Sequence, residues 1–98
     1  MKKLTLALFA LLAAPATAQE MTPDEMCAML GTYAEAVMSA RQSGTPLAAI
    51  LETVSGEPVL RGLVMIAYNQ PRFSTAEYQQ EAIDVFRDNV HLGCLQAQ

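Results

Sequence analysis

Several residue types are scarce in this chain of 98 residues, and their scarcity narrows its possible functions. There is no tryptophan, a single histidine (His91), and only two cysteines, Cys27 and Cys94. Two cysteines and one histidine are too few side chains for a closed zinc site, and the chain has no C-x-x-C redox motif. No second catalytic element accompanies His91, which as a general base would need a nucleophile or a polarised water nearby. We therefore expect no enzymatic activity and no cofactor, and interpret His91 as a residue near a helix C-terminus, where the helix dipole favours its charged form.

Lysine is confined to Lys2 and Lys3, at the extreme N-terminus. Residues 19–98 contain four arginines and ten carboxylates, which gives them a formal net charge of −6. Nucleic acids and anionic membrane surfaces are bound through clusters of basic residues. The charge therefore argues against both as partners.

The N-terminus has the three parts of a secretory signal peptide. The two lysines precede an apolar run of 11 residues, 4–14, and small residues follow at Ala16 and Ala18 in the pattern of a cleavage site. A membrane anchor is the alternative, but spanning a bilayer takes about 20 apolar residues. We predict a signal peptide at 1–18, a single helical domain at 19–98, and a location in the periplasm or outside the cell.

The two cysteines lie near the two ends of the predicted domain. An exported chain with only two cysteines is expected to join them, so we predict a Cys27–Cys94 disulfide, with free thiols or a metal site as alternatives. Such a bond closes a loop of about 68 residues, and the chain-entropy model predicts that it stabilises the fold by about 4 kcal/mol. A core built from 80 residues is marginal without such a cross-link.

Capping residues and apolar periodicity predict four helices. A capping box at Thr22 and Glu25 begins the first, and a second box at Ser74 and Glu77 begins the last. Thr45 is expected to cap the second helix. The predicted ranges are about 22–43, 45–55, 57–69 and 74–94. The run 63–68 could also form a strand, but no second strand exists to pair with it.

The third helix is apolar nearly all round, which is typical of a central helix covered on several sides. We expect Gly62 to permit close approach by a neighbour and Met65, like Met38, to lie in the core. Met26 and Met29 fall off the main apolar stripe and are expected to be exposed, where they could bind an apolar partner.

The disulfide also predicts the arrangement of the helices. Its Cα atoms must lie within about 7 Å of each other, so the start of the first helix must meet the end of the fourth. The simplest packing is antiparallel, with the two middle helices closing the remaining sides. The fold class is therefore an all-α, compact four-helix domain closed by one disulfide.

An acidic stripe follows one side of the fourth helix, at Glu77, Glu81, Asp84 and Asp88. It could bind a divalent cation weakly, but the loop of a calcium site is missing. We expect a solvated helix face, with no metal site.

The segment 68–74 is the best candidate for a partner-binding site, through Tyr68, Arg72 and Phe73. Aromatic residues and arginine are favoured anchors in interfaces. The structural alternative is that Phe73 packs on Tyr78 or a neighbour as a hydrophobic staple and that Arg72 pairs with a carboxylate.

The chain resembles a group of small exported helical proteins of proteobacteria and their phages, whose function is unknown. The segments that carry the resemblance are Cys27, Arg41–Gly44, Ala67–Tyr68, Pro71–Ser74, Glu77–Gln80, Phe86–Asp88 and Cys94. A weaker resemblance is to the acid-stress chaperones of the bacterial periplasm, which are also small, helical and closed by one disulfide.

Three functions follow as expectations. The first is a non-enzymatic domain that binds a protein or peptide in the periplasm. The second is an acid-responsive chaperone, since ten carboxylates would become neutral as the pH falls. The third is a small hydrolase or metal-dependent enzyme. The sequence says nothing about oligomeric state.

Overall fold

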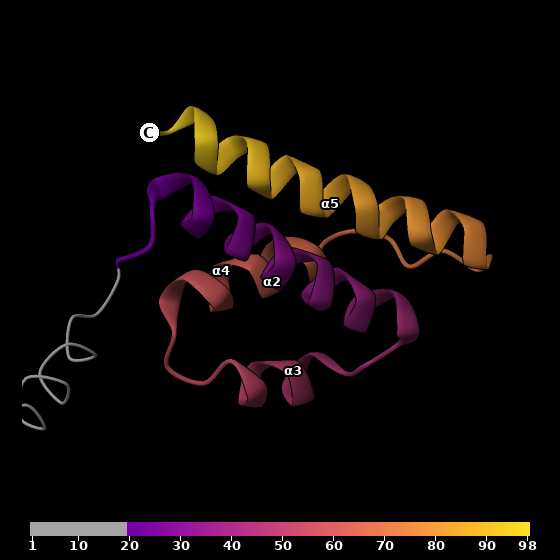
Figure 1. Ribbon diagram of the computed structural model, residues 1–98. Coiled ribbons are helices and arrows are strands. Elements are labelled where there is room, and N and C mark those ends of the chain that lie inside the picture. Colours follow the sequence, from indigo (N-terminus) through magenta and orange to yellow (C-terminus); the bar gives the residue numbers. More distant parts are fainter. Residues whose placement is uncertain (1–19) are drawn as a thin grey trace, which may run out of the picture.

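Four helices account for the regular structure of the residues that are described. The structure is a computed structural model, and it describes residues 20–98, so the predicted signal peptide at 1–18 lies outside the described residues. The helices are α2 (Pro23–Ser43), α3 (Leu47–Thr53), α4 (Pro58–Tyr68) and α5 (Ala76–Gln96), as Figure 1 shows. Within residues 20–98 there is no strand, so the predicted all-α, four-helix fold is confirmed.

The ends of α2 follow from its sequence. The Thr22 hydroxyl accepts a hydrogen bond from the Glu25 amide at 3.1 Å, and the Glu25 carboxylate accepts one from the Thr22 amide at 2.9 Å. This capping box satisfies two amides that have no partner inside the helix. At the other end, Gly44 has a φ of 87°, a left-handed conformation that glycine adopts without a steric penalty.

The starts of α3 and α5 differ from the prediction by one residue each. Thr45 does not cap α3, because its amide bonds to the carbonyl of Ala40 and so belongs to the end of α2. Pro46 takes the N-cap position instead. In α5 the cap is Thr75, whose hydroxyl accepts a hydrogen bond from the Tyr78 amide, so the capping box predicted at Ser74 is wrong.

Helices α2 and α5 form an antiparallel pair that runs the length of the domain (Figure 1). The Cys27–Cys94 disulfide is present at one end of the pair, with the two Cα atoms 5.4 Å apart. One turn along α2, the helices approach closely at Gly31, where an added Cβ would lie 3.2 Å from the Cβ of His91. The predicted antiparallel packing of the first and last helices is confirmed.

The core lies mainly around α2, which contacts each of the other three helices. Helix α4 packs against α2, while α3 contacts both α4 and α2. The buried apolar side chains come from α2, α4 and α5; they are Ala34, Val37, Met38, Leu63, Val64, Ala67, Ile83 and Phe86.

The third predicted helix, α4, is not covered on several sides. Only Leu63, Val64 and Ala67 are buried in it, and Met65 is 46% exposed, so the predictions of a central α4 and a core Met65 are wrong. Nothing lies within 4 Å of a Cβ added at Gly62, so the expected close approach there is absent as well. The reason is that α2 occupies the centre and contacts all three other helices, whereas α4 contacts α2 and α3. Met38 is buried, and Met26 and Met29 are exposed, as predicted.

No helix within residues 20–98 combines the length and the apolar character that crossing a membrane requires.

We expect the disulfide to contribute a large part of the stability of the domain. The double variant Cys27→Ser/Cys94→Ser should lower the free energy of unfolding by about 2–5 kcal/mol, because the unfolded chain gains loop entropy. Urea denaturation followed by circular dichroism measures the change. The intact mass of the native protein should rise on reduction, and an unchanged mass would contradict an intramolecular bond.

We also expect the α2 capping box to make stability depend on pH. The hydrogen bonds from Thr22 hold the pKa of Glu25 below its ordinary value, so its contribution is present above the pKa of the unfolded chain and is lost as the pH falls through the folded pKa. The unfolding temperature should therefore fall below about pH 4.3, the ordinary pKa of glutamate, and fall less in Glu25→Gln. Thermal melts of both proteins from neutral pH downward measure this, and identical pH dependences would contradict it.

Candidate functional site

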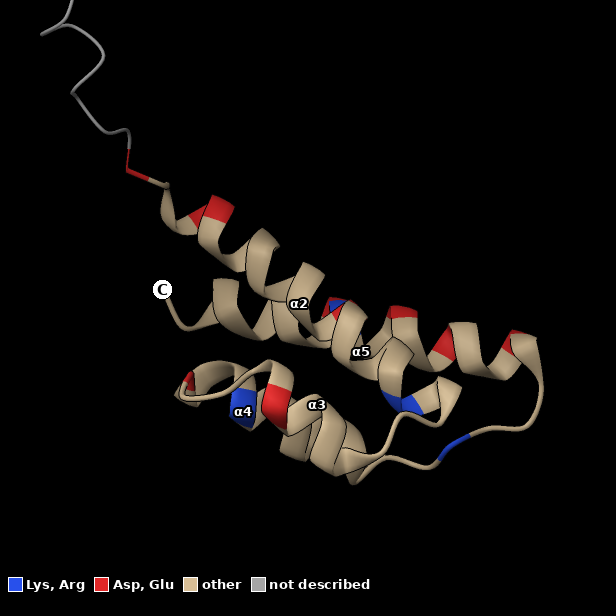
Figure 2. Ribbon diagram, turned by 90° about the horizontal axis from the view of Figure 1, so that it is seen from below, with Lys and Arg blue, Asp and Glu red and all other residues tan. Residues whose placement is uncertain are grey.

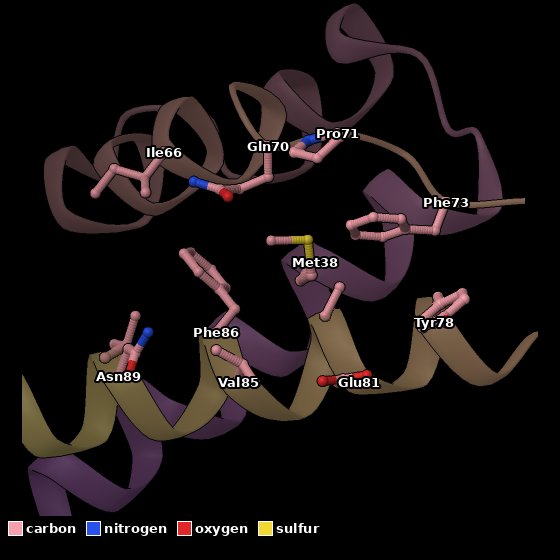
Figure 3. A pocket seen from close by; sticks show the side chains of 12 residues that line it. Met38, Ile66, Gln70, Pro71, Phe73, Tyr78, Glu81, Val85, Phe86 and Asn89 are labelled. Atoms are coloured by element: carbon pink, nitrogen blue, oxygen red, sulfur yellow. The ribbon is translucent and has the colours of Figure 1, made fainter.

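A groove lies alongside α5, between it and the segment that leads from α4 into α5. Its volume is about 600 Å³. Figure 3 shows Met38 of α2 between Ile66 and Pro71 on one side and α5, with Val85 and Phe86, on the other. The lining residues are Met38, Ile66, Gln70, Pro71, Phe73, Tyr78, Glu81, Ala82, Val85, Phe86, Asn89 and Val90.

The floor and the sides of the groove differ in exposure. Met38 and Phe86 are buried, at 2% and 8% exposure. Ile66, Tyr78 and Val85 are 52%, 57% and 51% exposed. Apolar side chains that converge on a concave surface while remaining half accessible are typical of a binding site rather than of a core.

The groove exists because α4 and α5 both pack against α2 and are not packed along each other. The connection between them, residues 69–75, closes one end of the gap and carries Phe73 into it (Figure 3). This connection has no regular secondary structure, so other residues must hold its backbone.

Gln42, in the last turn of α2, holds that connection. Its side chain is 1% exposed. Its amide nitrogen donates to the carbonyl of Pro71 at 2.9 Å, and its amide oxygen accepts from the amide of Phe73 at 2.9 Å. The neighbouring Arg41 donates from Nε to the carbonyl of Gln70 at 3.1 Å. Two consecutive α2 residues therefore position three residues of the connection.

Three residues were predicted to contact a partner. Two of them, Tyr68 and Arg72, donate hydrogen bonds to backbone carbonyls of the domain itself. The Tyr68 hydroxyl donates to the carbonyl of Thr45 at 2.8 Å, and the Arg41 guanidinium lies 5.4 Å from the centre of its ring. Burial raises the pKa of Tyr68, and the Arg41 charge opposes this rise. Arg72 donates from Nε to the carbonyl of Gln42 at 2.9 Å.

Of the predicted partner contacts, Phe73 is the one that lines the groove. Its ring packs on Tyr78 with the centroids 6.2 Å apart, which confirms the contact expected from a hydrophobic staple. The expectation that Arg72 pairs with a carboxylate is wrong, because its Nε bonds a backbone carbonyl and no ion pair within residues 20–98 includes it. Partner binding by Tyr68, Arg72 and Phe73 stays a prediction.

Sequence reasoning missed Gln42 and most of the α5 side of the groove. A glutamine in the last turn of a helix is usually exposed. Gln42 is buried because it bonds residues far along the chain, and no local pattern reveals those partners. Val85 could have been found, because it lies seven residues after Tyr78 and so falls on the same helix face.

Charges on α5 fall into two groups. Arg87 pairs with Glu35 of α2, Asp84 and Asp88, which raises the pKa of Arg87 and holds that of Asp88 low. All ion pairs within residues 20–98 belong to Arg87, so Glu77 and Glu81 have no cationic partner there. Figure 2 shows the acidic positions recurring along α5.

His91 and the acidic stripe are the remaining candidates for reactive side chains. His91 is half-buried against Gly31 of α2, five residues before the end of α5. Among the residues that the structure describes, no group of three or more His, Cys, Asp or Glu side chains is placed to hold a metal ion.

No family model matches the chain, and neither the curated proteins nor the solved structures contain a match to it.

We expect removal of the Gln42 side-chain amide to release the connection. Gln42→Ala leaves the Phe73 amide and the Pro71 carbonyl without their partner, which should cost about 1–3 kcal/mol of stability. Hydrogen exchange at the Phe73 amide should accelerate at the same time. The control is Gln80→Ala, because Gln80 is an exposed glutamine of α5 that bonds only Asp84 within the described residues. Equal effects of the two substitutions would contradict the role of Gln42.

Proposed function

We propose that this chain is an exported, non-enzymatic domain that binds an apolar segment of another protein in the groove beside α5. The observation that carries the proposal is the groove itself, with a buried apolar floor and half-exposed apolar sides. Burying apolar surface there would stabilise a complex by roughly 25 cal/mol per Å² of surface removed from water.

The placement outside the cytoplasm rests on two features. One is the sequence of residues 1–18, which has the pattern of a secretory signal peptide. The other is the disulfide, a bond that persists in the periplasm and in secreted proteins and is rare in the cytoplasm.

A binding domain is favoured over an acid-responsive chaperone. The chaperone hypothesis requires acid to loosen the helices and expose their apolar faces. In this fold an apolar surface is already accessible while the helices are packed, so binding needs no loosening.

Site-specific photo-crosslinking tests the proposal. A photoreactive phenylalanine derivative replaces Ile66 or Val85, and in a control protein it replaces Ala36. Ala36 is exposed and lies at a separate, smaller pocket that contains neither Ile66 nor Val85. In the producing cells we expect one discrete protein adduct from Ile66 and Val85 and none from Ala36.

A second substitution makes the test specific for the groove. Val85→Glu places a charge on the apolar side of the groove at a half-exposed position, where it should not disturb folding. The adduct from Ile66 should disappear in this background. Adducts that form equally at all three positions, or that persist in Val85→Glu, would contradict the proposal.

A further inference from the structure

We infer that the groove takes a basic, amphipathic α-helix of a partner protein, lying along α5. This inference rests on the proposed function and identifies the kind of segment that is bound.

The backbone of the domain excludes one common way of binding a peptide. An extended peptide can add to the edge of a sheet, where unpaired backbone groups supply hydrogen bonds. Within residues 20–98 all regular structure is helical, so the backbone of α4 and α5 beside the groove bonds within its own helices and offers no sheet edge. A partner must therefore be recognised through side chains, as in the binding of a helix in a groove.

The exposed apolar residues of α5 have the spacing that a second helix needs. Tyr78, Val85 and Leu92 follow one another at intervals of seven residues, and each is more than half exposed. Seven residues are about two helical turns, so the three side chains form one stripe about 21 Å long at 1.5 Å per residue. A partner helix of about 14 residues would cover the stripe.

Helix α4 presents a matching stripe. Val59 and Ile66 are also seven residues apart and are 55% and 52% exposed. Ile66 lines the groove, and Val59 lies on the same face of α4 two turns earlier. Gly62 lies between them with open space at its Cβ position, so the backbone of α4 is accessible to a partner there. Gly62 is therefore a position where a partner helix can approach α4 closely.

The charges beside the groove indicate the charge of the partner. Glu81 lines the groove, and Glu77 lies one turn before it on α5. Neither has a cationic partner within residues 20–98, and residues 20–98 carry four arginines against ten carboxylates. A helix with lysine or arginine beside its apolar face complements this surface. A second copy of the chain, with the same excess of negative charge, does not.

Binding of synthetic helical peptides to the exported, disulfide-bonded protein tests the inference. The probe is a labelled peptide of about 18 residues with leucines at helical spacing and lysines along one flank. One comparison peptide has the same composition with the leucine order scrambled, and another has glutamate in place of every lysine. Fluorescence anisotropy measures the dissociation constants, and circular dichroism checks that each protein variant is folded.

We expect the basic amphipathic peptide to bind about tenfold or more tightly than either comparison peptide, a difference of about 1.4 kcal/mol. Glu81→Lys should weaken its binding by about fivefold, the effect of an exposed ion pair. Val85→Glu should weaken it by about tenfold or more, and Ala36→Glu, outside the groove, should not change it.

The outcomes separate this inference from the proposed function. Equal binding of the scrambled peptide, preference for the acidic peptide, or no binding of the basic peptide would overturn the helix inference, even if groove-specific adducts still form at Ile66 and Val85. Absence of those adducts as well would overturn the proposed function. Self-association that blocks peptide binding and is abolished by Val85→Glu would assign the groove to a second copy instead.

Discussion

The pairing of α2 with α5 is the interaction on which the rest of this structure depends. It buries apolar side chains along both helices, with Gly31 allowing a close approach and the disulfide joining one end. Because α2 also receives α4 and the connection into α5, it is the scaffold for every other element. A change that separated α2 from α5 would remove the floor of the groove at Met38 and Phe86 together with one of its sides.

The groove is a consequence of this arrangement and not of any single residue. A small domain in which three helices each contact the same central helix leaves gaps between those that do not contact one another. In this chain the gap beside α5 is lined by apolar residues such as Ile66 and Val85, where a purely structural surface would be expected to carry polar ones. The apolar lining is the feature on which the proposed binding role rests.

Local sequence signals predicted the local structure well. The capping box at Thr22 and the disulfide depend on short-range chemistry and on the number of cysteines, and both are confirmed. Thr45 and Ser74 were wrong as caps because the Thr45 amide bonds Ala40 at the end of α2 and the adjacent Thr75 caps α5.

The candidate site was harder to predict, because it depends on which faces meet. The apolar circumference of α4 is equally consistent with a central helix and with a helix that exposes one apolar face. Only the position of α2 distinguishes the two. Gln42 is an extreme case: its partners are about 30 positions away along the chain, so no local pattern indicates that it is buried.

The position of the disulfide has a mechanical consequence. Cys27 lies near the start of α2, whereas the groove residue Met38 and Gln42 lie about 17 and 23 Å farther along it at 1.5 Å per residue. A disulfide at one end of two long helices limits their separation there far more than it limits the angle between them. The disulfide therefore fixes the spacing of α2 and α5 near Cys27 and Cys94. Toward Met38 and Gln42 the angle between the two helices is set instead by side-chain packing and by the hydrogen bonds from Gln42 to the connection.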